Sequence, residues 1–251
     1  MRRRPKGENR QEKQKIIRGP GAAAKPLGPD GQRSGERKKE PEVSRGKVCA
    51  GLFRLEQARE VEDLKTKELL GILSSQPIIA SVKNDEELEQ ALQSDVGVIF
   101  LLYGTILSVG ELTQRVHQSG KQVFVHLDMV EGLAPKEVAA DFIARTTAAD
   151  GVISTKAQLT RRARELGLVA IPRFFLLDSK AMSSMEQFSP GAADVVEVLP
   201  GLMPKAIHRV AQSIRRPVIA GGLIREKEDV TAALAAGAVA VSATSPDVWA
   251  M

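Results

Sequence analysis

Short apolar runs alternate with longer amphipathic stretches from Pro77 to the end of the chain. Eight β-type runs are predicted strands: Ile78–Val82, Val96–Tyr103, Gln122–Asp128, Gly151–Lys156, Val169–Asp178, Val195–Leu199, Val218–Gly222 and Ala238–Thr244. Helix-type stretches lie between them, near residues 84–94, 108–119, 135–147, 157–166, 180–188, 204–214 and 226–236. Nearly apolar strands alternating with helices indicate a parallel sheet covered by helices. Eight such units predict an α/β fold, a compact (β/α)8 TIM-type barrel, and an open doubly wound sheet is the alternative.

Helix start and stop signals agree with these boundaries. Asn84 precedes three acidic residues and is a predicted N-cap. Pro135 and Pro204 fit first-turn positions. Gly120, Gly167 and Gly237 each follow a predicted helix directly, as C-terminal capping glycines do.

The N-terminal part of the chain differs from the barrel pattern, so we divide the chain into three parts. Residues 1–47 are rich in Lys, Arg, Gly and Pro and are predicted to be a disordered basic leader. Residues 48–75 have an apolar helical face and are predicted to be a helix that covers the N-terminal mouth of the barrel or forms a partner surface. Residues 76–251 are the predicted barrel.

Charge is distributed unevenly between these parts. Residues 1–47 hold 15 Lys and Arg against 6 Asp and Glu, a net charge of +9, whereas the other 204 residues hold 21 against 25, a net charge of −4. The basic pI therefore comes from the leader and is no evidence that the folded domain binds nucleic acid. The charged N-terminus lacks the apolar core of a secretory signal, no apolar run is long enough for a membrane helix, and Cys49 is the one cysteine of the chain. We expect a cytoplasmic protein without a membrane partner.

Two glycines and two hydroxyls follow the seventh and eighth predicted strands. Gly221 and Gly222 end the run that starts at Val218, and Ser242 and Thr244 end the eighth run. Barrels commonly bind phosphate in the loops after strands 7 and 8, where glycines let an anion approach backbone N–H groups. We predict a phosphate-binding site at these four residues, the alternative being that the glycines serve only the turn.

Two cations lie in predicted strands, Lys156 and Arg173. Because a charge buried without a partner is costly, each needs a counter-charge. Glu197 and Asp128 could supply it in an internal salt-bridge network at the barrel mouth. Alternatively, Arg173 or Lys156 faces an anionic ligand, and Glu197 and Asp128 accept hydrogen bonds from its hydroxyls.

Candidate catalytic chemistry is sparse. His126 and Asp128 are two apart in the third predicted strand, so they share one face and could form an acid/base pair, although His126 also fits an interior residue. The three histidines have no metal-site spacing, and we find no nucleophile elbow, P-loop or dinucleotide fingerprint. We therefore predict no metal site and no cofactor. Aromatic residues make up 4 % of the chain, so RNA contacts would have to depend on cations and shape.

Five motifs in order resemble a known family. They are His126–Leu133, Asp150–Lys156, Arg173–Ser179, Glu197–Gly201 and Ala220–Ile224, followed by Trp249. Together they closely resemble the glycerol-3-phosphate-responsive antiterminator family, over about residues 69–249. The resemblance implies a barrel that binds glycerol-3-phosphate through Lys156, Arg173, Glu197, Gly221, Gly222 and Ser242.

The same resemblance implies a regulator and not an enzyme. With ligand bound, members of this family act on the mRNA leader of the glycerol uptake operon, so that transcription continues past a terminator. The expected partners are glycerol-3-phosphate and the operon leader mRNA, and a homo-oligomer is compatible with the sequence. The alternatives are a phosphate-binding barrel enzyme of the isomerase or aldolase kind, and a ligand-binding barrel without an RNA partner.

Overall fold

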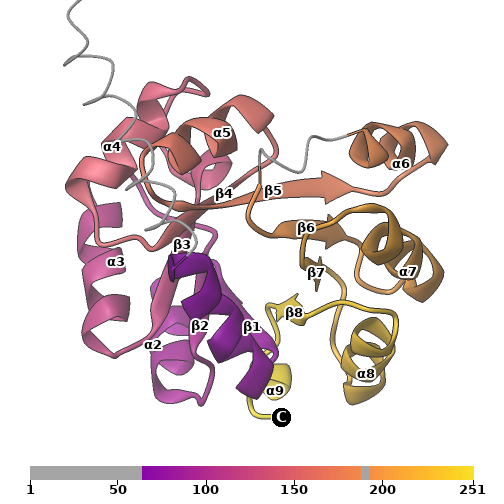
Figure 1. The fold of residues 1–251 in the computed structure, drawn as a ribbon. Helices are drawn as coiled ribbons and strands as arrows, with labels where there is room; N and C mark the ends of the chain where they lie inside the picture. The colour runs from indigo at the N-terminus through magenta and orange to yellow at the C-terminus, as the bar shows by residue number, and fades with distance from the viewer. Residues whose placement is uncertain (1–63, 188–192) are drawn as a thin grey trace, which may run out of the picture. The chain divides into compact units, whose positions relative to one another are not determined.

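A computed structural model describes residues 64–187 and 193–251 of the chain (Figure 1). The predictions for residues 1–47 and for residues 48–63 lie outside this range. Eight parallel strands close into one barrel in the order of the sequence. They are β1 (Ile78–Val82), β2 (Val98–Leu101), β3 (Gln122–His126), β4 (Gly151–Ser154), β5 (Val169–Phe175), β6 (Val196–Leu199), β7 (Val218–Gly221) and β8 (Ala240–Ala243). The predicted (β/α)8 barrel is confirmed, and the open sheet is excluded.

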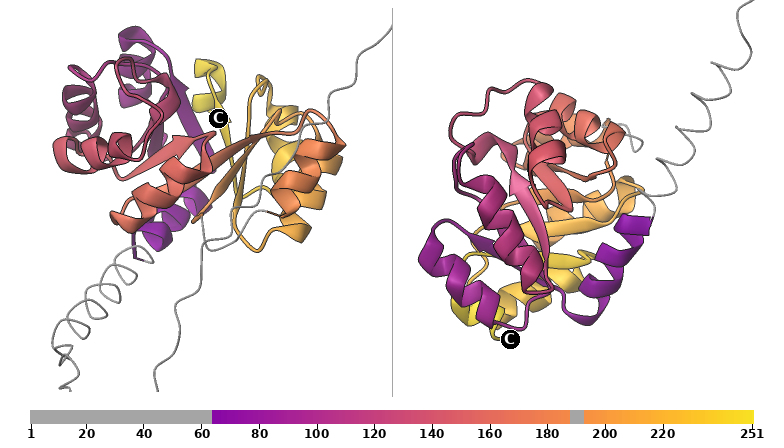
Figure 2. Two further views of the ribbon diagram at one scale, coloured as in Figure 1. Left: turned by 90° about the horizontal axis from the view of Figure 1, so that it is seen from above. Right: turned by 90° about the vertical axis from the view of Figure 1, so that its left-hand side faces the viewer.

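Helices follow the strands and surround them, as the two further views show (Figure 2). They are α2 (Asp85–Gln93), α3 (Val109–Gln118), α4 (Val138–Thr146), α5 (Ala157–Glu165), α6 (Ser179–Glu186), α7 (Pro204–Ser213), α8 (Lys227–Ala235) and α9 (Pro246–Trp249). The short helix α9 was not predicted, and the indole of Trp249 fixes it to the barrel by donating to the Ala243 carbonyl at 2.8 Å. In the described part of the chain, no helix has the length and hydropathy to cross a bilayer.

Two layers of apolar side chains hold the barrel together. One buried cluster lies between the strands and the helices, and the other contains the side chains that point into the barrel, among them Ile79, Phe124 and Ile219. Phe100 and Phe124 meet edge to face in this interior, with ring centroids 5.7 Å apart. Alternation along each strand therefore assigns every second residue to the interior, up to the mouth at the carboxyl ends.

Residues 64–75 form a helix before β1. Leu69 and Leu73 of this helix are buried in the same cluster as the inward-facing strand residues. Lys65 Nζ of this helix donates to the Gly167 carbonyl at 3.1 Å, just before β5, so the helix lies at the amino ends of the strands. Its packing leaves the carboxyl ends of the strands open.

Capping predictions were mostly right. Asn84 accepts a hydrogen bond from the Glu87 N–H at 2.8 Å, and Pro204 is the first residue of α7. Gly120 and Gly167 both have a φ of +77° directly after their helices. Pro135 was placed wrongly, because α4 begins only at Val138, after a turn.

Six of the eight predicted strands were too long at their carboxyl ends, whereas β1 and β6 end where predicted. β3 ends at His126, and Asp128 lies in a 3-10 helix at Leu127–Met129, so these two residues do not share a strand face. β4 ends at Ser154, and Lys156 is the N-cap of α5 instead of a strand residue. The error has one physical cause, since the chain turns away where the ladder partners end and the polar tips begin.

Candidate functional site

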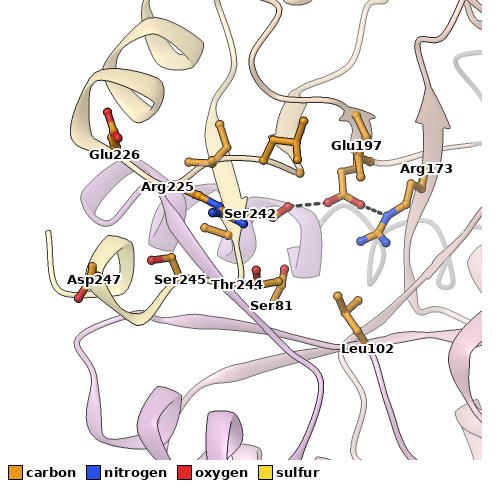
Figure 3. A pocket seen from close by; sticks show the side chains of 15 residues that line it. Ser81, Leu102, Arg173, Glu197, Arg225, Glu226, Ser242, Thr244, Ser245 and Asp247 are labelled. Carbon is orange, nitrogen blue, oxygen red and sulfur yellow. Dashed lines mark hydrogen bonds and ion pairs between the residues drawn. The ribbon is translucent and has the colours of Figure 1, made fainter.

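A cavity of about 720 Å³ opens at the carboxyl ends of the strands (Figure 3). It is bordered by β1, β5, β6 and β8 and by the segments that follow β2, β7 and β8. Its polar lining includes Ser81, Arg173, Glu197, Ser242, Thr244 and Arg225. This is the end of a TIM barrel at which ligands bind and chemistry occurs.

A buried carboxylate forms the floor of the cavity. The Glu197 side chain is fully buried and accepts hydrogen bonds from Arg173 Nε at 2.5 Å and from Ser242 Oγ at 2.6 Å. Strand register brings these groups together, because Arg173 lies beside Glu197 across β5 and β6. Both carboxylate oxygens thus have a donor, and the charge of Arg173 is balanced within the protein.

Gly221 is required by this arrangement. It pairs with Ser242 across β7 and β8, and a Cβ placed on it would lie 2.4 Å from Ser242 Oγ and 2.6 Å from Glu197 Oε1. No side chain fits there without displacing the carboxylate. The glycine after β7 therefore makes room for the buried ion pair as well as for the turn.

The segment after β7 turns sharply at the cavity wall. Gly222 has a φ of +78° and Leu223 a φ of +66°, the left-handed region that a leucine rarely adopts. The turn is fixed to α8, because Asp229 Oδ2 accepts the backbone N–H groups of Arg225 and Glu226 at 3.0 and 3.1 Å. The Glu226 side chain completes a capping box at the start of α8.

Asp128 and Lys156 form a separate cluster at the ends of β3 and β4, and neither lines the cavity. Lys156 Nζ donates to Asp128 Oδ1 at 2.7 Å, and Oδ2 accepts from Ser154 Oγ, Thr155 N and Thr155 Oγ1 at 2.7 to 3.0 Å. Burial alone would raise the pKa of Asp128, but the hydrogen bonds from Lys156, Thr155 and Ser154 outweigh it and hold the pKa below its usual value. Both oxygens of the Asp128 carboxylate therefore have donors within the protein, as expected if Asp128 and Lys156 form an internal salt bridge and do not face a ligand.

His126 is buried beside this cluster, with 3 % of the residue exposed. Its Nδ1 lies 3.9 Å from Asp128 Oδ2 and has no hydrogen-bond partner among the described residues. Burial, and next the positive charge of Arg173, lower the pKa of His126 to about 4. The imidazole is therefore neutral at physiological pH.

The structure brings most of the predicted site residues together. Arg173, Glu197, Gly222, Ser242 and Thr244 line the cavity, and Gly221 lies beneath it against Glu197.

Sequence reasoning missed Arg225, which lines the cavity. The available signal was its position three residues after the glycine pair, where the turn after β7 directs it to the mouth. Within residues 64–187 and 193–251, no three His, Cys, Asp or Glu side chains come together as metal ligands.

Comparison with known proteins gives consistent results. The family model described as "Glycerol-3-phosphate responsive antiterminator" matches residues 78–249. The Uncharacterized protein YgcP of Escherichia coli (strain K12) is 40 % identical over 182 residues, which is 72 % of this chain and 95 % of that protein.

Two solved structures are similar in both sequence and fold. A glycerol uptake operon antiterminator regulatory protein from Listeria monocytogenes is 32 % identical with a TM-score of 0.66, over 68 % of this chain and 93 % of that one. A glycerol uptake operon antiterminator-related protein from Thermotoga maritima is 36 % identical with a TM-score of 0.62, over 69 % of this chain and 98 % of that one. The five motifs, the barrel and the family match agree, and the chain belongs to the glycerol-3-phosphate-responsive antiterminator family.

Proposed function

We propose that this protein is a glycerol-3-phosphate-sensing antiterminator that acts on the mRNA leader of a glycerol uptake or metabolism operon. The observation that supports ligand binding best is the cavity at the barrel mouth, with the Arg173–Glu197 pair and Ser242 at its floor. Family membership supports the regulatory role.

The cavity suits a small phosphorylated polyol. Glycerol-3-phosphate combines one phosphate with two hydroxyls, so its site needs both anion donors and hydroxyl acceptors. Glu197 is a buried acceptor, Arg173 and Thr244 are donors around the same space, and Ser242, whose proton goes to Glu197, can accept from a ligand hydroxyl. In this proposal the hydroxyls bind at Glu197 and Arg173, and the phosphate lies against the β7 and β8 ends, at Gly222 and Thr244.

Thermal unfolding of the full chain with and without glycerol-3-phosphate tests the effector. A ligand at 100 times its Kd adds about 2.7 kcal/mol. This corresponds to a rise in Tm of about 5–11 °C for a folded domain of this size. Glycerol and inorganic phosphate, each carrying half of the ligand's chemistry, should raise Tm much less at equal concentration. Equal shifts from all three compounds, or none at millimolar glycerol-3-phosphate, would contradict the effector assignment.

Binding of the operon leader transcript tests the regulatory role. We expect glycerol-3-phosphate to strengthen binding to the leader but not to an unrelated RNA of equal length. Binding should also weaken steeply with salt, since phosphate contacts dominate affinity for nucleic acid. A variant without residues 1–47 shows whether the basic leader segment contributes. Leader binding that does not respond to glycerol-3-phosphate would contradict ligand-controlled antitermination.

A barrel enzyme of the isomerase or aldolase kind is the second candidate, and the buried neutral imidazole of His126 is the observation that favours it. Acid/base chemistry would use this group beside Asp128, 3.9 Å away. Turnover of a small sugar phosphate that His126→Gln abolishes, without loss of the fold, would establish the enzyme. Absence of turnover with intact ligand binding would favour the regulator.

A further inference from the structure

Both cations that the sequence pattern indicated as ligand contacts are already paired with an acid. Arg173 Nε binds the fully buried Glu197, and Lys156 Nζ binds Asp128. A phosphate that approaches either pair meets a group with almost no net charge. Displacing the arginine from Glu197 would leave a buried carboxylate without its counter-charge, which is costly. The phosphate therefore needs another cation.

Arg225 meets this requirement. It lines the same cavity, and its guanidinium has no acidic partner among residues 64–187 and 193–251. Its backbone is held in place, because the Arg225 N–H donates to Asp229 Oδ2 at 3.0 Å. The side chain is exposed, so it can turn to a ligand without breaking an existing interaction.

Asp229 accepts the backbone N–H of Arg225, and the two acids that line the cavity near Arg225 are directed elsewhere. The Glu226 side chain accepts the Asp229 N–H in the capping box of α8, and Asp247 lies in the first turn of α9. Figure 3 shows both at the outer edge of the cavity, whereas the guanidinium of Arg225 is directed to the side where Ser242 and Thr244 lie. The cation and these two hydroxyl groups thus face one region of the wall.

We propose that Arg225 is the residue that pairs with the phosphate of the ligand, beside Thr244 and the turn at Gly222, while the Arg173–Glu197 pair recognises the hydroxyl end. This inference rests on the proposed function and deepens it, because it divides the site between a neutral, buried part and a cationic, exposed part. The ligand class that fits is a phosphate monoester of a small polyol. A guanidinium binds phosphate through two N–H groups in one plane, which a neutral amide cannot reproduce.

Isothermal titration calorimetry of the full-length protein tests this assignment with Arg225→Gln. Since hydrogen bonds between charged groups contribute about 1.5–3 kcal/mol, Kd for glycerol-3-phosphate should rise by about tenfold to more than a hundredfold. Arg215→Gln is the matched control, because Arg215 is also exposed and precedes β7 at the opposite end of the barrel. We expect this control to keep the wild-type Kd. Arg225→Gln should unfold at the wild-type temperature without ligand, since no described contact of its side chain is lost.

The same titrations separate this inference from the proposed function. A normal Kd for glycerol-3-phosphate in Arg225→Gln overturns the inference and leaves the effector in place. Equal weakening in Arg225→Gln and Arg215→Gln also overturns it, because the effect would then be long-range charge. If the wild type ignores glycerol-3-phosphate but binds dihydroxyacetone phosphate or 3-phosphoglycerate, and Arg225→Gln weakens that binding, the effector is wrong and the role of Arg225 is supported. If the wild type binds none of these esters, both are overturned.

Discussion

The substitution Glu197→Gln tests whether the floor of the cavity is a coupled ion pair. Gln has nearly the volume of Glu, and its amide oxygen can accept from Arg173 Nε or from Ser242, but it carries no charge in either orientation. The change leaves a guanidinium with 8 % of its side chain exposed and no counter-charge. Breaking a buried pair in this way costs about 3–5 kcal/mol. For a folded domain of this size that is a loss of about 6–20 °C in Tm.

Urea unfolding followed by circular dichroism measures this loss as a lower midpoint with an unchanged m-value. The exposed Glu68→Gln, on the helix at the opposite end of the barrel, is the matched control and should stay within about 0.5 kcal/mol of wild type. Adding Arg173→Met to Glu197→Gln should restore part of the stability, because the orphaned charge is then removed. A loss below about 1 kcal/mol for Glu197→Gln, or a double variant less stable than both singles, would refute the coupling.

Three further predictions concern the mouth and its supports. The pKa of His126 is about 4 in the folded protein and about 6.5 in the unfolded chain, so below pH 6.5 the unfolded chain binds a proton that the folded protein does not. The free energy of unfolding should therefore fall by up to about 3 kcal/mol as the pH drops from 6.5 to 4. His126→Gln should flatten this part of the wild-type pH profile. Gly221→Ala should lower the free energy of unfolding by about 1–3 kcal/mol, because the new Cβ overpacks against Glu197. Gly71→Ala lies in a helix with nothing within 4 Å of the new Cβ, and it should raise the same free energy by about 0.5–1 kcal/mol in the same urea titration. Leu223→Gly should raise stability by up to about 1 kcal/mol, because it removes the cost of a left-handed leucine; a lower unfolding midpoint would show that the side chain packs usefully.

The barrel could be predicted from sequence because its strands are short apolar runs that alternate regularly with amphipathic helices. The hydrophobic periodicity can be recognised within a short segment, and it recurs in each strand–helix unit of the fold. The carboxyl ends of the strands were harder, as Asp128 and Lys156 show. Polar residues there lie at the barrel mouth, beyond the last hydrogen bonds between neighbouring strands. A local sequence pattern does not show where those hydrogen bonds end.

Pairings between distant residues could be predicted only as alternatives. Asp128 contacts Lys156 28 positions away, and Ser242 contacts Glu197 45 positions away, through the closure of the barrel. The sequence allowed Glu197 to face a ligand or Arg173, and the structure shows the pair with Arg173. It also separates Asp128 from the cavity, which no spacing rule could have done.

Arg225 escaped notice because a charged residue after a turn resembles any solvated loop residue. What distinguishes it is the charge balance of the mouth. Each candidate cation within the strand-end motifs faces its own acid, whereas no acid in residues 64–187 and 193–251 pairs with the Arg225 guanidinium. A site built this way can stay folded without ligand, because its buried charges are neutralised internally. The uncompensated cation lies where water solvates it until a phosphate arrives. Substitution of Glu197 should therefore change mainly the stability of the fold, and substitution of Arg225 mainly the affinity for the ligand.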